Sequence, residues 1–164
     1  MSIWGVLGDT GIESGEVISA LVQSLNPSFV IAVDALASAS AHRVATTVQL
    51  ADTGISPGAG IGNNRPRLDE QSLGVPVYAV GVPTVVHAAT VASEAANAAL
   101  SQSEKGMDML NEVDQLLQAH CGDMIVTPKD IDAIAQGCAD TIANALNMAL
   151  HPGISMEEAL QVLH

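Results

Sequence analysis

The sequence predicts an α/β fold with a three-layer α/β/α arrangement around a mainly parallel sheet. Short β-branched apolar runs alternate along the chain with longer segments of helical spacing. One run, residues 29–33, is followed directly by Asp34, as expected where a buried strand reaches the carboxyl edge of a parallel sheet. The 164 residues suffice for one core and are too few for two domains, so residues 1–164 are expected to form a single domain.

The predicted helices follow from apolar spacing and from their end signals. Apolar residues recur with helical spacing over residues 13–25, and Asn26-Pro27 ends that helix. Thr127-Pro128 begins a later helix that runs to about residue 150. Ser155 and Glu158 form a capping box for a last short helix. Two Ala- or Leu-rich segments complete the set, at residues 84–100 and 107–119.

Three strands are expected, at residues 29–33, 46–50 and 75–80. Pro76 lies near the start of the third, where a missing backbone donor is tolerated. Between the second and third strands, residues 52–74 form a long loop with five glycines and two prolines. Loops of this length inside compact domains are usually functional or mobile, and we count residues of this one as candidates for binding.

The composition excludes several classes of partner. Eighteen acidic residues face five basic ones, and the net charge of −13 argues against nucleic acid. No apolar run reaches membrane-spanning length and no basic-then-apolar leader is visible, so we expect a cytoplasmic protein. The isolated Cys121 and Cys138 predict small core residues of a reduced protein, with neither a metal site nor a cofactor.

The basic residues are unevenly placed. Arg43, Arg65 and Arg67 fall close together in sequence, which is either chance or a positive patch suited to an acidic peptide. The glycine-rich segment beside them lacks the Lys-Ser/Thr of a phosphate loop and does not open a helix after a strand, which argues against a nucleotide. We count this segment with the arginines as candidate substrate-binding residues: Gly58, Gly60, Gly62 and Asn63.

Asp34 is the best candidate for a catalytic group, and a second one is harder to find. Asp-Thr-Gly occurs twice, beginning at Asp9 and Asp52, but the pepsin-type proteases that use this tripeptide are all-β and rich in aromatic residues. We therefore interpret both tripeptides as sequences favoured in turns. His87 follows the third strand and is the one histidine expected near the sheet edge that carries Asp34. Asp9, Asp52 and His87 are therefore the possible second acid or base.

The chain resembles the germination protease family of spore-forming bacteria over most of its length. The matching motifs include Thr10-Gly-Ile-Glu-Ser14, Phe29-Val-Ile-Ala-Val-Asp-Ala-Leu-Ala37 and Thr46-Thr-Val-Gln-Leu-Ala-Asp-Thr-Gly-Ile55. They continue in the family's order through Pro57-Gly-Ala-Gly-Ile-Gly-Asn63, residues 73–86, Val126-Thr-Pro-Lys-Asp-Ile-Asp132 and Asn147-Met-Ala-Leu-His-Pro152.

This resemblance implies an oligomeric, cytosolic, aspartic-type endopeptidase that degrades small acid-soluble spore proteins without a cofactor. It also implies a fold similar to the hydrogenase-maturation proteases, within the phosphorylase/hydrolase-like class. The family uses two carboxylates: one ends the Val-Ile-Ala-Val-Asp motif and corresponds to Asp34, and the other lies upstream in a Thr-Pro-Asp-Ala-x-Gly-Pro loop.

We find no counterpart of that upstream loop in the 164 residues. The chain also has Ala39 where the family usually has Arg, His87 where it usually has Asp, and a shorter segment before the Val-Thr-Pro helix. Three hypotheses follow: a protease inactive by itself or part of a split enzyme, an active enzyme with a rebuilt site, and a non-catalytic peptide-binding or assembly subunit. Without the family's first strand, an open sheet edge is expected, covered by a second copy or by another chain.

Overall fold

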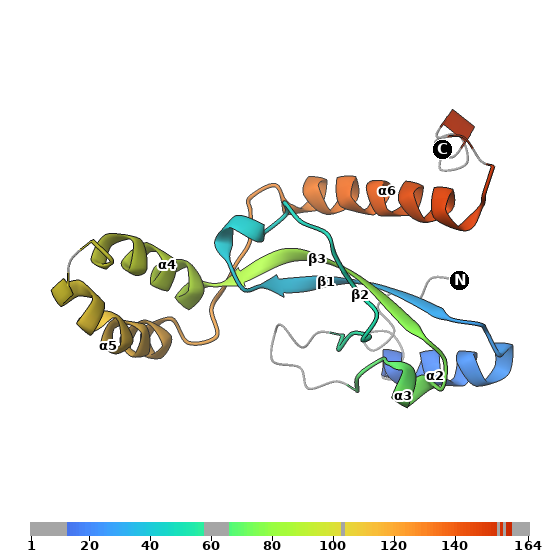
Figure 1. Ribbon diagram of the computed structural model, residues 1–164, viewed down its shortest axis with the longest axis horizontal. Coiled ribbons are helices and arrows are strands. Elements are labelled where there is room, and N and C mark those ends of the chain that lie inside the picture. The colour runs from blue at the N-terminus through green and yellow to red at the C-terminus, as the bar shows by residue number, and fades with distance from the viewer. Residues whose placement is uncertain (1–12, 58–65, 103, 154, 156, 159–164) are drawn as a thin grey trace.

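A computed structural model describes residues 13–57, 66–102, 104–153, 155, 157 and 158 of the chain (Figure 1). In these residues four strands form one sheet: β1 (Val30–Ser38), β2 (Gln49–Ala51), β3 (Val77–His87) and β4 (Ile125–Val126). The α-helices are α2 (Ser14–Leu25), α3 (Glu70–Leu73), α4 (Ala88–Leu100), α5 (Glu104–Cys121) and α6 (Ile131–Leu150). A 3-10 turn, η1 (Ala41–Arg43), follows β1.

Strand β3 organises the sheet. It pairs in parallel with β1, from Val30 opposite Val77 onward, and antiparallel with β2 and β4. The order β1-β3-β2 leaves β1 at one edge of the described sheet. The predicted α/β class is confirmed, with a sheet that mixes parallel and antiparallel pairs.

Apolar side chains alternate between the two faces of the sheet, and helices lie on both (Figure 1). On one face, Ala79 packs with Ile55 and Leu68 and with partly buried residues of α2 and α3; we call this the α2 face. On the other, Val80 and Val82 pack against Ile142 of α6; we call this the α6 face.

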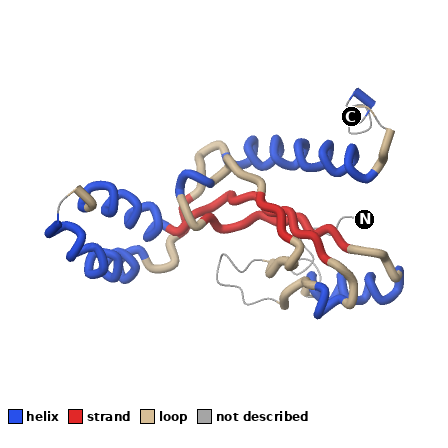
Figure 2. Tube along the Cα trace, in the orientation of Figure 1, coloured by secondary structure: helices blue, strands red, loops and turns tan. Residues whose placement is uncertain are grey.

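Helices α4 and α5 pack against each other and extend past the end of the strands, as Figure 2 shows. Helix α4 begins directly after β3, with His87 as its N-cap residue. Its thirteen residues contain seven alanines and neither glycine nor proline, which is a strongly helix-forming composition. None of the described helices is both long and apolar enough to cross a bilayer.

Two strands extend further than predicted. β1 continues four residues past Asp34, because Ala35 to Ser38 still pair with β3. β3 likewise runs to His87. The helix expected to begin at residue 84 therefore begins only at Ala88. The register shifts after Leu36: Leu36 lies opposite Pro83 and Ala37 lies opposite Val85, so Thr84 is an extra residue of β3, as in a β-bulge. Asp34 therefore lies inside a strand, and its predicted place at the strand end is wrong.

The other elements follow the prediction with local differences. The helices expected at residues 13–25 and 107–119 are present as α2 and α5. The helix expected from Thr127 is present as α6, but it begins at Ile131 with Asp130 as its N-cap residue. The predicted start at Thr127 is wrong, because the Thr127 hydroxyl donates to the Thr84 carbonyl instead. The capping box is formed, since the Ser155 N–H and hydroxyl both donate to the Glu158 carboxylate. The predicted strand over residues 46–50 begins only at Gln49, and the predicted loop contains α3 and a bridge between Ile55 and Leu68. β4 had no sequence signal.

Candidate functional site

Asp34 lies in the middle of β1 on the α2 face. Its neighbours on that face, Ala32 and Leu36, pack against the core cluster of Ile55, Leu68 and Ala79. Across the ladder it stands opposite Gly81 of β3, where an added Cβ would overlap the Leu36 side chain. A carboxylate thus interrupts an otherwise apolar strand face.

The two oxygens of the Asp34 carboxylate have different surroundings. Oδ1 accepts a hydrogen bond of 2.9 Å from the Ala35 N–H. Oδ2 is inaccessible to solvent, and no described residue donates a hydrogen bond to it. A buried acceptor without a partner costs about 1–3 kcal/mol, and such atoms are uncommon in folded proteins. We therefore expect a hydrogen-bond donor to bind Oδ2, and a protonated carboxyl group or a substrate N–H would supply it.

The outer edge of β1 is open in the described part of the molecule. The Val30 N–H donates to the Pro76 carbonyl at 2.9 Å, so the even-numbered residues of β1 direct their backbone groups toward β3. The backbone groups of Ile31, Val33 and Ala35 then point outward, where no described strand pairs with them. The Ala35 N–H, which points toward this edge, donates to Oδ1 of Asp34, so the Asp34 carboxylate lies beside the open edge.

The other predicted acids and bases do not join Asp34. The register of β2 places Asp52 on the α6 face, on the opposite side of the sheet from Asp34. His87 stands six residues beyond Gly81 along β3, which corresponds to about 20 Å of strand. Asp9 lies outside the described residues. Within the described ranges the structure brings none of these candidates to Asp34.

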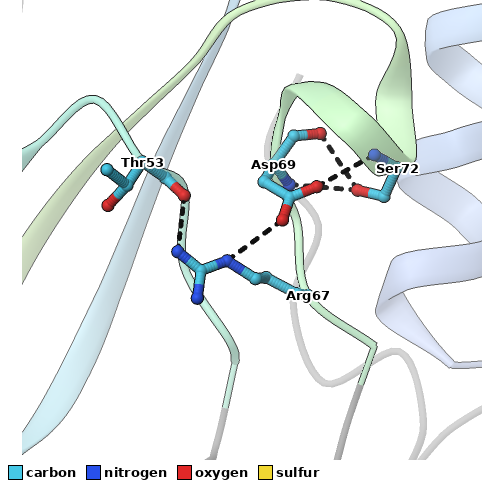
Figure 3. A network of polar contacts seen from close by, with 4 residues as sticks. All are labelled: Thr53, Arg67, Asp69 and Ser72. Carbon is cyan, nitrogen blue, oxygen red and sulfur yellow. Dashed lines mark hydrogen bonds and ion pairs between the residues drawn. The ribbon is translucent and has the colours of Figure 1, made fainter.

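Arg67 is held in a polar network (Figure 3). Its Nη2 donates to the Thr53 carbonyl at 2.7 Å, and its Nε lies 3.0 Å from Asp69 Oδ2. Asp69 is the N-cap of α3 and accepts a hydrogen bond from the Ser72 N–H at 2.9 Å. That backbone bond, more than the nearby Arg67 charge, lowers the pKa of Asp69.

Beside this network, backbone hydrogen bonds join the two stretches of chain on either side of the glycine-rich segment. Ile55 and Leu68 exchange two backbone hydrogen bonds, of 2.9 and 2.8 Å. Gly54 adopts φ of +80°, and a side chain there would meet the Leu68 carbonyl. The predicted binding residues Gly58, Gly60, Gly62, Asn63 and Arg65 belong to the segment between these two ends and lie outside the described residues.

Arg43 is separated from Arg67 by the length of the sheet. Arg43 is exposed in η1, after the last residue of β1, whereas Arg67 precedes α3, which leads into the first residue of β3. Because β1 and β3 are parallel, these positions lie at opposite ends of the sheet. The predicted positive patch is therefore not assembled from Arg43 and Arg67.

A junction between η1 and α4 had no sequence signal. Glu94 of α4 accepts a 3.2 Å hydrogen bond from the Ala41 N–H, across 53 positions of sequence. A hydrogen bond from the Ser40 side chain is the main cause that lowers the pKa of Glu94, with smaller contributions from Ala41 and the His42 charge. Buried Ser38 supports the turn, because its hydroxyl donates to the Ser40 carbonyl at 2.6 Å.

Metal-binding side chains are scattered in the described part of the chain. No three His, Cys, Asp or Glu side chains gather there closely enough to hold an ion.

A family model described as germination protease matches residues 2–121 of the chain. Curated germination proteases are also similar. That of Clostridium perfringens is 46% identical over 176 residues, covering 98% of this chain and 54% of the relative. That of Clostridium acetobutylicum is 41% identical over 170 residues, covering 94% and 52%.

The germination protease of Halalkalibacterium halodurans is 37% identical over 207 residues, covering 98% of this chain and 56% of the relative. This share corresponds to about 161 residues of this chain, so about 46 aligned positions have no residue here. The chain spans about half the length of these curated relatives. The family match and these identities together show that the chain belongs to the germination protease family.

Proposed function

We propose that the chain contributes one carboxylate, Asp34, to a germination-protease active site whose second carboxylate comes from a polypeptide segment outside these 164 residues. The proposal rests on Oδ2 of Asp34, which is buried and has no hydrogen-bond partner among the described residues. It lies next to the open edge of β1, where a further strand can place a group within reach. Asp52 and His87 are not placed to fill that position.

Two adjacent carboxylates divide the work of peptide hydrolysis. Because like charges close together cannot both ionise easily, one stays charged and the other keeps a proton. The charged one takes a proton from the attacking water, and the protonated one polarises the peptide carbonyl and then protonates the leaving amine. The Ala35 N–H holds Oδ1, so Oδ2 is the oxygen that a donor from the further segment would meet.

We also propose for this chain the more specific properties that the family resemblance implies. They are aspartic-type endopeptidase activity on small acid-soluble spore proteins, a cytoplasmic location, action without metal or cofactor, and oligomeric assembly. The three-layer α/β/α arrangement similar to hydrogenase-maturation proteases also stays a prediction. The runner-up is a non-catalytic peptide-binding or assembly subunit, which the positions of Asp52 and His87 away from Asp34 favour.

A cleavage assay on the chain alone tests the proposal. Purified chain is incubated with a peptide from a small acid-soluble spore protein, with Asp34→Asn as the control, and products are identified by mass spectrometry. We expect no cleavage by either, since one carboxylate cannot fill both roles. Cleavage that Asp34→Asn leaves undiminished would contradict the proposal. Cleavage that this variant abolishes would keep Asp34 but place the second group within this chain.

A further inference from the structure

The α6 face of the sheet is only partly covered. Helix α6 packs over Val80 and Val82, but it leaves Leu50 77%, Val33 53% and Tyr78 48% exposed. Leu50 and Tyr78 line a hollow of about 520 Å³ together with residues of the sheet and of the last turns of α6. The hollow is mostly apolar, with Asp52 as its one charged lining residue.

Helix α6 itself has little charge on its outer side. Its twenty residues include two charged ones, Asp132 and Asp140. Most of its other exposed positions are small or apolar, among them Ala145, Met148 and Leu150. A helix without a charged solvent face is typical of one that is covered on both sides. The helix and the hollow therefore form one continuous apolar surface.

The charges on this surface argue against a second copy of the chain as its occupant. Asp52, Asp132 and Asp140 are all acidic, and the chain as a whole carries −13. Face-to-face self-association would bring like charges together, which opposes binding. A different polypeptide, apolar at the centre of the contact and not acidic at its rim, fits better.

The length of the relatives points to one occupant, namely the part of each relative that this chain does not match. The Clostridium perfringens relative matches 98% of this chain with 54% of its own length, so close to half of it has no counterpart here. We propose that the hollow and the outer side of α6 are the docking surface for a polypeptide equivalent to that remaining half. The contact lies on the face of the sheet opposite Asp34. The docking proposal therefore does not depend on whether Asp34 is catalytic.

A chimera tests this docking by hydrogen exchange. This chain replaces the segment that it matches in the full-length Clostridium perfringens protease, and backbone exchange over residues 77–80 and 143–150 is compared in the chimera and in the chain alone. We expect exchange to be slower by about tenfold or more in the chimera, because docking removes local opening. Leu50→Asp in the chimera should return these rates toward those of the chain alone. The matched control Leu116→Asp, on the exposed surface of α5, should not.

Several results would overturn the proposal. These are equal exchange in the chimera and the chain alone, equal effects of Leu50→Asp and Leu116→Asp, and separate unfolding transitions for the two parts of the chimera. A dimer of the chain alone by sedimentation, with residues 143–150 already protected and released by Leu50→Asp, would assign the surface to a second copy instead.

Discussion

Asp34 is costly to the fold at the residue scale, because an oxygen of its charged carboxylate is buried without a donor among the described residues. Replacing it by Asn removes the charge and keeps an oxygen for the Ala35 N–H. We therefore expect Asp34→Asn to raise the free energy of unfolding of the chain alone by about 1 kcal/mol at pH 7, as at other sites where function opposes stability. Urea unfolding measures this. Exposed Asp52→Asn is the control, and a loss of stability in Asp34→Asn would assign Asp34 a structural role.

Residue 81 must be glycine because the Leu36 side chain occupies the space where a Cβ would lie. A methyl group at residue 81 would overlap that side chain, so Gly81→Ala should lower the free energy of unfolding by about 1–3 kcal/mol. Gly137→Ala is the matched control, since nothing lies within 4 Å of a Cβ there and alanine favours the helix by about 1 kcal/mol.

A double-mutant cycle with Leu36→Ala isolates the contact. The cost of Gly81→Ala should shrink when Leu36 is already truncated, because the overlap is then gone. An unchanged cost would mean that backbone flexibility, and not Leu36, requires glycine at this position.

At the scale of elements, Glu94 joins α4 to the turn after β1. The pKa of Glu94 is lowered in the folded state, so its contribution to stability is present above its ordinary value of 4.5 and is lost as the pH falls through the folded pKa. We expect Glu94→Gln to be less stable than the parent chain at pH 6, and we expect this difference to shrink as the pH falls below 4.5. Urea midpoints across this range measure it, and Ser40→Ala should act in the same direction. A difference that stays constant with pH would contradict the assignment.

The sequence predicts helices better than strands in this chain, for physical reasons. Helix α6 follows from its local apolar spacing, although its first residue is Ile131 and not the predicted Thr127. The extension of β1 through Ala35 and Ser38 depends on pairing with β3, which local propensity does not encode. The two-residue strand β4 has too few residues for any pattern.

The candidate site was only partly predictable. Asp34 could be found because a carboxylate directly follows a β-branched run. Its unpartnered oxygen depends on tertiary packing, and the face occupied by Asp52 depends on the register of β2, where one residue of shift exchanges the two faces. The bond from Glu94 to Ala41 joins positions too distant in sequence for any motif.

At the scale of the whole molecule, three features point to one cause. The open edge of β1, the uncovered α6 face and the unpartnered Asp34 oxygen are each unfavourable in an isolated domain. All three are expected of a chain that matches about half the length of its relatives. A polypeptide equivalent to the other half would pair the edge, cover the apolar surface and place a group beside Asp34.

The rate of spore-protein peptide cleavage by the chimera, compared between Asp34→Asn and Asp123→Asn, tests the central claim most directly. Both substitutions remove one carboxylate charge, but Asp123 is exposed in the turn after α5, outside the site and the docking surface. We predict that the chimera cleaves the peptide, that Asp34→Asn slows cleavage by about 10³-fold, and that Asp123→Asn leaves the rate unchanged. Equal rates for the two variants would contradict the assignment of Asp34 as a catalytic carboxylate.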